Sequence, residues 1–320
     1  MNGTKIIVIL ATIVLSFSCD KKNEKLPSHE IKFIKISNEV SLEVLDWGGN
    51  GAPILFLSGL GNSAHVFDDF APKFTDKFHV YALTRRGFGA SSQPKNGYDI
   101  KTLSQDIISV IDQLHLKKVI LVGHSIAGEE MTKTGNDYPD RIEKIIYLDA
   151  AYDRTLLANQ FTPMPEDPTP NATDSTSIQT MKKFWKELRG VSFPNEELQQ
   201  IMTFSKEGKY LKDVTPVAIA GSIFKNVIKP EYSTIKCPSL AIYAKYDSVK
   251  GPFPFYEMLD SVNKNKANQF FPIWIEISTE SSGRFLKESK NGIVKRIKGY
   301  HYIFISNSDE TEKSMRDFLK

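Results

Sequence analysis

The sequence predicts an α/β fold: a mostly parallel sheet of about eight strands with helices on both faces and a helical cap insertion. Short apolar segments alternate with segments of helical periodicity through the first half of the chain, as in parallel sheets. One apolar segment, 119–122, ends at a glycine-flanked serine that is followed at once by helical character. The alternation stops at residue 153 and returns after residue 234, which marks the intervening segment as an insertion.

The strands follow from apolar runs bounded by turn residues. Segments 31–37 and 40–47 are separated by two polar residues and predict an antiparallel hairpin at the edge of the sheet. Strands that are covered on both faces are apolar throughout rather than alternating. Runs of this kind predict six further strands, at 53–57, 78–83, 119–122, 142–148, 238–244 and 292–298.

Helical periodicity is clearest over 103–114, where apolar residues spaced three and four apart mark one face. Residues 102–105 fit the capping-box pattern, which predicts that this helix begins there. Further helices are expected after the 53–57 strand (carrying Phe67, Phe70 and Phe74), after the serine turn up to 138, around 255–262, in a segment ending near 289, and over 308–319.

These patterns divide the chain into four parts. They are a signal segment 1–19, a polar tether 20–30, an α/β core formed by 31–152 and 235–320, and a cap 153–234. Within the cap, helices are expected around 181–188, 196–204 and 210–223.

The first nineteen residues have the pattern of a secretory signal. Lys5 precedes an apolar run, 6–17, which is shorter than the roughly 20 residues of a membrane-spanning helix. The Ser18–Cys19 junction resembles a bacterial lipobox, in which the cysteine is lipidated. We therefore expect an exported lipoprotein that is held at a membrane of the cell envelope through Cys19. The alternative is plain periplasmic or secreted export, with Cys19 removed in the signal.

Charge and metal-ligand content exclude several classes of function. The chain carries 41 basic and 38 acidic residues, a net charge of +3, spread along its length without a basic arm. Nucleic acid is therefore not an expected partner. The six histidines are scattered and the two cysteines lie far apart, so the sequence predicts no metal site and no cofactor.

The chemistry is indicated by residues 123–128, which read GHSIAG after the 119–122 strand. A serine on a tight turn between strand and helix projects its hydroxyl above the sheet edge. Ala127 stands where this pattern usually has its second glycine, a departure of one methyl group. This context predicts Ser125 as a nucleophile.

A nucleophilic serine needs a base and an acid that orients the base. His301 is the only histidine after Ser125, and it follows the 292–298 strand, so it is the expected base. Two carboxylates follow strands at suitable places. Asp247 comes after the cap and is preferred on chain order, whereas Asp149, at the end of the 142–148 strand, is the alternative acid.

The oxyanion formed during acyl transfer needs backbone N–H donors. Ile126, directly after the nucleophile, and Leu60, in the glycine-containing loop after the 53–57 strand, are the expected donors. Glu129 and Glu130 start the following helix. We expect one of them to pair with Arg85 or Arg86, at the end of the neighbouring strand, and to brace the serine turn against the adjacent loop, because an unpaired charge there would be costly. The alternative is that both lie on the solvated surface and compensate the helix dipole.

Together, the serine turn, the glycine loop, the 86–89 turn (RGFG), the late aspartate and the final histidine resemble the α/β-hydrolase fold superfamily over nearly all of the chain. The resemblance is to capped, esterase-like members with a serine nucleophile. It implies hydrolysis of an ester-type acyl bond in a small apolar substrate through an acyl-enzyme, without a cofactor. Cleavage of a carbon–carbon bond, thioester or lactone by the same triad is an alternative. Another is a non-catalytic small-molecule-binding protein of this fold.

Overall fold

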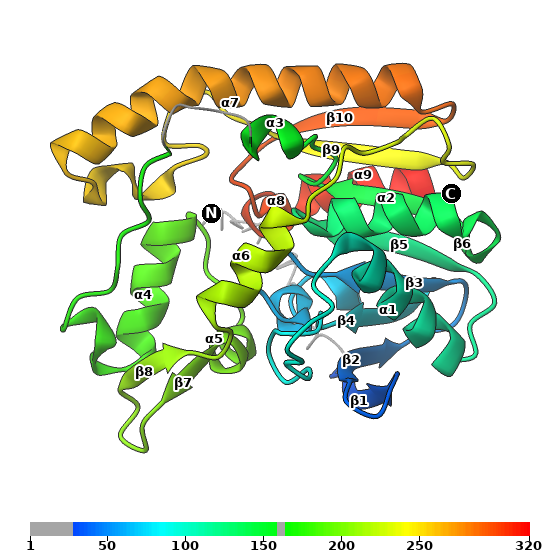
Figure 1. The fold of residues 1–320 in the computed structure, drawn as a ribbon, viewed down its shortest axis with the longest axis horizontal. Helices are drawn as coiled ribbons and strands as arrows, with labels where there is room; N and C mark the ends of the chain where they lie inside the picture. The colour runs from blue at the N-terminus through cyan, green and yellow to red at the C-terminus, as the bar shows by residue number, and fades with distance from the viewer. Residues whose placement is uncertain (1–27, 159–163) are drawn as a thin grey trace, which may run out of the picture.

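The computed structural model describes residues 28–158 and 164–320, so Cys19, the signal segment and most of the tether lie outside the described residues. Its centre is an eight-stranded sheet with the order β1-β2-β4-β3-β5-β6-β9-β10 (Figure 1). The strands are β1 (Glu30–Lys35), β2 (Ser41–Gly48), β3 (Pro53–Leu57), β4 (His79–Leu83), β5 (Val119–His124), β6 (Ile142–Leu148), β9 (Ser239–Lys245) and β10 (Gly292–Lys298).

The sheet is mostly parallel, as predicted. Strand β1 pairs antiparallel with β2, and β2 pairs antiparallel with β4, whereas every other pairing in this sheet is parallel. The N-terminal hairpin is therefore confirmed as an edge feature. All carboxyl ends of the parallel strands meet at one edge, which is where open α/β sheets place their ligand-binding loops.

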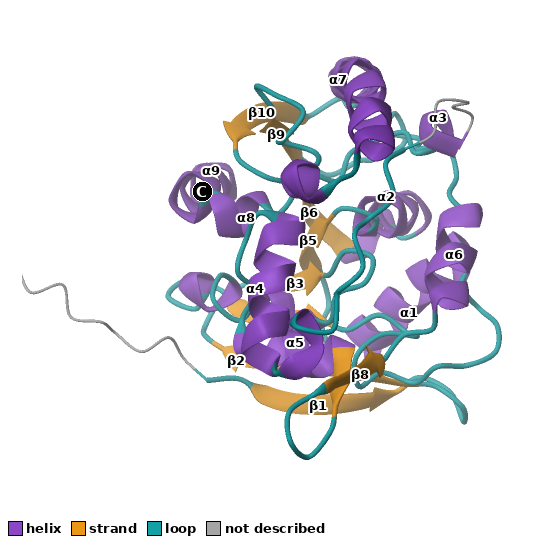
Figure 2. Cartoon of the chain, turned by 90° about the vertical axis from the view of Figure 1, so that its left-hand side faces the viewer, coloured by secondary structure: helices purple, strands orange, loops and turns teal. Residues whose placement is uncertain are grey.

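Helices cover both faces of the sheet, which Figure 2 shows nearly edge-on. They are α1 (Ile100–Gln113), α2 (Ala127–Asp137), α3 (Thr155–Ala158), α4 (Ile178–Arg189), α5 (Asn195–Ile201), α6 (Val217–Lys225), α7 (Ser261–Glu288), α8 (Ile303–Ser306) and α9 (Ser308–Leu319). Helices α1 and α2 and the C-terminal part of α7 pack on one face. The 3₁₀ turns η1 (Ala64–Phe67) and η2 (Ala71–Phe74), with α8 and α9, pack on the other.

Several helix predictions need correction. Helix α1 starts at Ile100 because the Asp99 side chain accepts the Thr102 N–H as its N-cap, so the expected start at 102 is late by two residues. The three phenylalanines after β3 lie on or beside the short turns η1 and η2 rather than on one α-helix. Pro72, at the start of η2, has no N–H to continue a preceding helix.

The region before β10 holds one long helix rather than two. Residues Pro254–Met258 form a 3₁₀ turn (η5), and α7 then runs without a break for 28 residues. The Asp260 side chain accepts the Asn263 N–H and defines its start. Helix α7 crosses the top of the molecule in Figure 1, and its two halves pack into different parts of the core.

The insertion between β6 and β9 lies at the left and centre of Figure 1 and contains α3–α6. It is less helical than predicted, because β7 (Met202–Phe204) and β8 (Tyr210–Asp213) form an antiparallel pair within it. Met181, Phe184 and Leu198 belong to the same apolar cluster as the sheet, so the insertion shares the core of the domain. Among the described helices, none is both long and apolar enough to cross a membrane.

Candidate active site

Ser125 stands on a strained turn between β5 and α2. Its φ of 55° lies in the left-handed region, which residues other than glycine seldom adopt. Its N–H donates to the Leu148 carbonyl of β6 at 3.2 Å, and its own carbonyl accepts the Gly128 N–H at 3.0 Å. Strain of this kind persists only where the surroundings enforce it, and it is concentrated at functional sites.

Two glycines allow the backbone to close around this turn. A Cβ at Gly128 would lie 2.1 Å from the Ala150 carbonyl oxygen, so no side chain fits where α2 passes the end of β6. A Cβ at Gly59 would lie 2.7 Å from His124 Nδ1 and 3.3 Å from the Ser125 Cβ. The loop after β3 therefore lies directly against the serine turn.

His301 follows β10, and its ring is held by the aspartate at the end of β6. His301 Nδ1 donates to Asp149 Oδ2 at 2.6 Å. The Asp149 carboxylate is fully buried and also accepts the Ala244 N–H at 2.9 Å. Because Nδ1 carries the proton in this bond, the other ring nitrogen, Nε2, is free to act as a base.

The structure corrects the preference for Asp247. Its side chain is 51% exposed and pairs with Lys298 Nζ at 2.6 Å at the end of β10. Hydrogen bonding and charge attraction to Lys298 lower the pKa of Asp247. The partner of His301 is instead Asp149, the alternative acid. Both carboxylates end strands after Ser125, and chain order alone could not tell which of them faces the histidine.

Two tyrosines that the sequence analysis did not identify complete the surroundings of Asp149. Tyr152 O–H donates to Oδ1 at 2.5 Å, and Tyr246 O–H donates to Oδ2 at 3.2 Å. Burial, and then the charge of Asp149, raise the pKa of both phenols well above the usual value. They therefore stay protonated and act as fixed donors that stabilise the carboxylate. A tyrosine following each of two strand ends was the only sequence signal for this arrangement.

His124 supports the loop that carries His301. Its Nε2–H donates to the His301 carbonyl oxygen at 3.1 Å, and the two ring centroids are 4.5 Å apart. Burial, together with the charge of His301, lowers the pKa of His124 well below its usual value. His124 is therefore neutral and orients the main chain of His301.

The predicted oxyanion donors lie beside the serine turn. In the described part of the chain, neither the Leu60 N–H nor the Ile126 N–H has a hydrogen-bond partner, so both are available. The Leu60 loop is braced internally, because the Ser58 hydroxyl donates to the Asn62 carbonyl at 3.1 Å. Leu60 lines the same cavity as Ser125 and His301.

The predicted brace between α2 and β4 is confirmed. Arg85 Nε donates to Glu130 Oε1 at 2.5 Å, and both side chains are buried. The same guanidinium donates to the carbonyls of Ser58 at 2.8 Å and Gly59 at 3.3 Å. Arg85 therefore links the serine helix to the loop that carries Leu60. Glu129 pairs elsewhere, with Arg154 at 3.4 Å.

A buried carboxylate from the insertion reaches the same loop. Glu197, on α5, accepts from Asn62 Nδ2 at 2.7 Å and from the Ser63 hydroxyl at 2.5 Å. The Tyr302 hydroxyl donates to Asn62 Oδ1 at 3.0 Å, next to His301. Glu197 is fully buried, and this burial outweighs its hydrogen bonds and raises its pKa to about 7. The insertion, the Leu60 loop and the histidine loop thus share one network.

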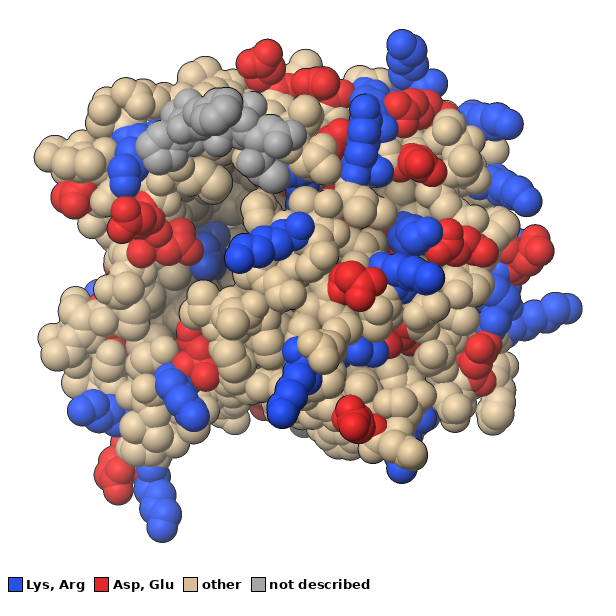
Figure 3. Space-filling view, viewed as in Figure 1, with Lys and Arg blue, Asp and Glu red and all other residues tan. Residues whose placement is uncertain are grey.

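A cavity of about 250 Å³ opens at Ser125 and His301. Figure 3 shows the surface hollowed beside α4 and below α7, the elements that form its walls. Its wall combines the polar groups beside Ser125 with apolar side chains, among them Met164, Pro252, Phe253, Phe255, Phe270 and Trp274. The site can therefore enclose a small apolar group next to the serine and the histidine.

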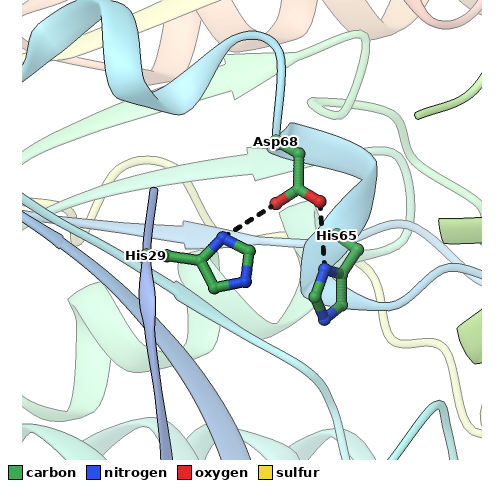
Figure 4. A group of neighbouring side chains, drawn as sticks. All are labelled: His29, His65 and Asp68. Atoms are coloured by element: carbon green, nitrogen blue, oxygen red, sulfur yellow. Dashed lines mark hydrogen bonds and ion pairs between the residues drawn. The ribbon is translucent and has the colours of Figure 1, made fainter. Parts of the chain in front are cut away.

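Outside the catalytic site, His29, His65 and Asp68 bring three potential metal ligands together. The sequence analysis did not identify this cluster. Asp68 bridges two histidines, with its carboxylate oxygens 3.4 Å from His29 Nδ1 and 3.0 Å from His65 Nδ1 (Figure 4). Burial disfavours the charged form of His65, but Asp68 and Glu43 outweigh it and raise its pKa to about 10. A protonated imidazole has no lone pair for a metal, so the contact between His65 and Asp68 is an ion pair. Burial lowers the pKa of His29, the other histidine of the cluster.

The family is shown by comparison with known proteins. The family model described as alpha/beta hydrolase fold matches residues 52–250, more than half of the chain. The chain belongs to the alpha/beta hydrolase fold family. A 2-(acetamidomethylene)succinate hydrolase from Mesorhizobium japonicum is 31% identical over 101 residues, which cover 32% of this chain and 36% of that protein. The AB hydrolase superfamily protein YisY of Bacillus subtilis is 26% identical over 239 residues, 71% of this chain and 85% of that protein.

Solved structures with little sequence similarity share the fold of this family member. An E-2-(acetamidomethylene)succinate hydrolase has a TM-score of 0.64 at 17% identity, covering 91% of this chain and 99% of that one. A membrane phospholipase A has a TM-score of 0.61 at 17% identity, covering 92% and 86%. The first curated relatives match over about 36–44% of their own length. At these identities the structures show the shared fold alone.

Proposed function

We propose that this protein is a serine hydrolase that cleaves an ester-type acyl bond with Ser125 as nucleophile, His301 as base and Asp149 as the orienting acid. The observation that carries the proposal is the 2.6 Å hydrogen bond from His301 Nδ1 to the buried Asp149, at a cavity also lined by the strained Ser125. Family membership and the hydrolase names of several relatives support hydrolytic chemistry.

The proposed reaction has two halves. His301 Nε2 takes the Ser125 hydroxyl proton while Oγ bonds to the ester carbonyl carbon, and the resulting oxyanion accepts the N–H groups of Leu60 and Ile126. The bond to the alcohol oxygen then breaks, and that oxygen takes the proton from His301. Water repeats the sequence on the acyl-enzyme and releases the acid. Asp149 stays ionised and stabilises the imidazolium in both halves.

The cavity walls favour an apolar group on the substrate. Aromatic and proline side chains from η5 and α7 surround the space beside Ser125, and such walls bind apolar groups by excluding water from them. The proposed substrate is therefore a small ester with an apolar portion. No metal or cofactor takes part in this proposed scheme.

A fluorophosphonate probe tests the proposal, because it reacts with activated serines. The purified protein should be labelled on Ser125 and should hydrolyse short 4-nitrophenyl esters. Ser125→Ala should lose labelling and turnover, by on the order of 10⁶ in kcat. Circular dichroism and the melting temperature should show that the variant is folded. Turnover that persists in Ser125→Ala would overturn the mechanism, and a folded wild type that neither reacts nor turns over any ester would favour a binding protein.

We also propose that Cys19 is lipidated and anchors the enzyme to a membrane of the cell envelope. The support is the sequence alone: an apolar run after Lys5 and the Ser18–Cys19 junction. Cys19→Ser should move the protein from the membrane fraction to the soluble fraction or stall its processing. A wild-type protein that is soluble and begins beyond Cys19 would contradict the anchor.

A further inference from the structure

The wall of the catalytic cavity includes one charged side chain, that of Arg189, among the described residues. The neighbouring walls are apolar, with Leu188 beside it and Phe255 from η5. A ligand that covers this wall would exclude water from the guanidinium, and the lower local dielectric constant would then strengthen its attraction to an opposite charge.

The backbone of Arg189 is fixed close to the histidine loop. Arg189 is the last residue of α4, and Gly190 follows in the left-handed conformation (φ 73°) that ends the helix. A Cβ at Gly190 would lie 2.7 Å from the ring of Tyr300, so the helix end packs directly on the residue before His301. The base of the Arg189 side chain is thus held in place relative to the reacting groups.

The guanidinium has donors to spare. Its Nη1 lies 3.0 Å from Asp167 Oδ2, and its carbon lies 5.2 Å from the ring centroid of Trp185. Apart from this contact with Asp167, its N–H groups have no hydrogen-bond partner among the described residues, although arginine carries five donors. The Arg189 side chain is 29% exposed and that of Asp167 is 51% exposed, so this ion pair is weak. A stronger anion could displace Asp167.

We propose that Arg189 binds a carboxylate carried by the substrate, so that the enzyme prefers half-esters of short dicarboxylic acids. This inference rests on the proposed function and narrows its substrate class. The carboxylate would receive the paired N–H groups of the guanidinium, as planar fork-to-fork contacts do. The methylene chain would lie along the apolar wall while the ester carbonyl lies at Ser125. Asp167 then acts as an internal competitor for the same guanidinium.

Two chromogenic esters of the same shape test the proposal. One is mono-4-nitrophenyl glutarate, which carries a free carboxylate. The other is 4-nitrophenyl glutaramate, in which a neutral amide replaces that carboxylate. The measured quantity is the ratio of kcat/KM for the two esters. Wild type should favour the glutarate, and Arg189→Gln should lower the ratio about tenfold or more, mainly through KM.

Two further variants sharpen this test. Lys183→Gln removes the same charge from an exposed position on the same helix and should leave the ratio unchanged. Asp167→Asn removes the internal competitor and should raise the ratio. The proposal would be overturned if the ratio of kcat/KM for the two esters were the same in wild type and Arg189→Gln. It would also be overturned if Arg189→Gln and Lys183→Gln lowered this ratio equally.

A binding measurement separates this inference from the proposed function. Calorimetry with glutarate alone needs no turnover, and Arg189→Gln should weaken binding about tenfold or more relative to wild type. If the protein hydrolyses neither ester yet binds glutarate through Arg189, the proposed function fails and the subsite stands. If it hydrolyses the neutral ester and Arg189→Gln changes neither selectivity nor glutarate affinity, the subsite fails and the proposed function stands.

Discussion

The catalytic edge of the sheet and the cavity wall above it are held together differently. At the edge, Asp149 is fully buried and accepts hydrogen bonds from a histidine, two tyrosines and a backbone amide. At the wall, Arg189 and Asp167 form one ion pair that solvent reaches. Many buried hydrogen bonds therefore fix the position of the catalytic side chains at the edge, whereas the polar side chains of the wall have few partners.

This difference teaches where chemistry and selectivity reside in the molecule. Groups that must keep one geometry through the reaction are fixed by burial and by several partners each, which is what preorganised catalysis requires. Side chains that determine substrate preference can be substituted with a smaller loss of folding stability. Changes at the edge should therefore lower stability or turnover, and changes at the wall should alter preference.

The largest effect on stability is expected at the Arg85–Glu130 pair. Glu130→Ala leaves the buried Arg85 without its partner and should lower the free energy of unfolding by about 3–5 kcal/mol. Asp137→Ala removes the exposed Lys133 pair from the same helix and should cost about 0.3–0.5 kcal/mol. Denaturant melts of both variants measure the contrast. Equal costs would show that the buried pair does not brace the edge.

Smaller changes in stability, of opposite sign, are expected from a glycine substitution at the catalytic edge and from one in the insertion. Gly128→Ala places a Cβ against the Ala150 carbonyl and should cost about 1–3 kcal/mol or more. Gly221→Ala, on α6 in the insertion, meets no atom within 4 Å and should stabilise by up to about 1 kcal/mol. Thermal melts compare them. A tolerated Gly128→Ala would contradict the tight closure of the edge.

The weakest expected effect is a pH dependence of the unfolding free energy that comes from Glu197, where the insertion meets the Leu60 loop. The pKa of Glu197 is about 7 in the fold, above the roughly 4.3 of an exposed glutamate. The folded state therefore binds this proton more tightly, so its contribution to stability is full below about pH 4 and is lost as the pH rises through about 7. Glu197→Gln, which stays neutral, should gain stability relative to wild type between pH 5 and pH 8. Unfolding free energies measured across this range give the difference.

The exposed neighbour Glu196 provides the control for this prediction, since Glu196→Gln should show a difference from wild type that does not vary with pH. If the stability difference between Glu197→Gln and wild type also did not vary with pH, Glu197 would be ionised in the folded state at no cost in free energy.

The sequence was informative where local rules operate. Apolar runs located the strands of the main sheet, and the glycine-flanked serine located the turn whose strained φ the structure bears out. Ile126 and Leu60 could be named because backbone donors depend on chain position alone. The choice between Asp149 and Asp247 failed for the opposite reason. Which carboxylate faces His301 depends on packing between β6, β9 and β10, and both aspartates satisfy the same local pattern.

The cavity wall was the least predictable part. Arg189, Phe255 and Trp274 come from separate elements, and only the fold brings them to one cavity. The cluster of His29, His65 and Asp68 was missed likewise, because 36 positions separate its two histidines along the chain. The short β7–β8 pair within the insertion lacked a clear alternation, and its segments had been expected to be helical.

The most direct test of the central claim is the comparison of Asp149→Asn with Asp247→Asn in ester hydrolysis. If Asp149 orients His301, Asp149→Asn should lower kcat by on the order of 10⁴ while the protein stays folded, because the imidazole would then adopt the wrong tautomer. Asp247→Asn, which alters only an exposed pair with Lys298, should keep nearly full turnover. A folded Asp149→Asn with near wild-type kcat, or a greater loss in Asp247→Asn, would contradict this assignment.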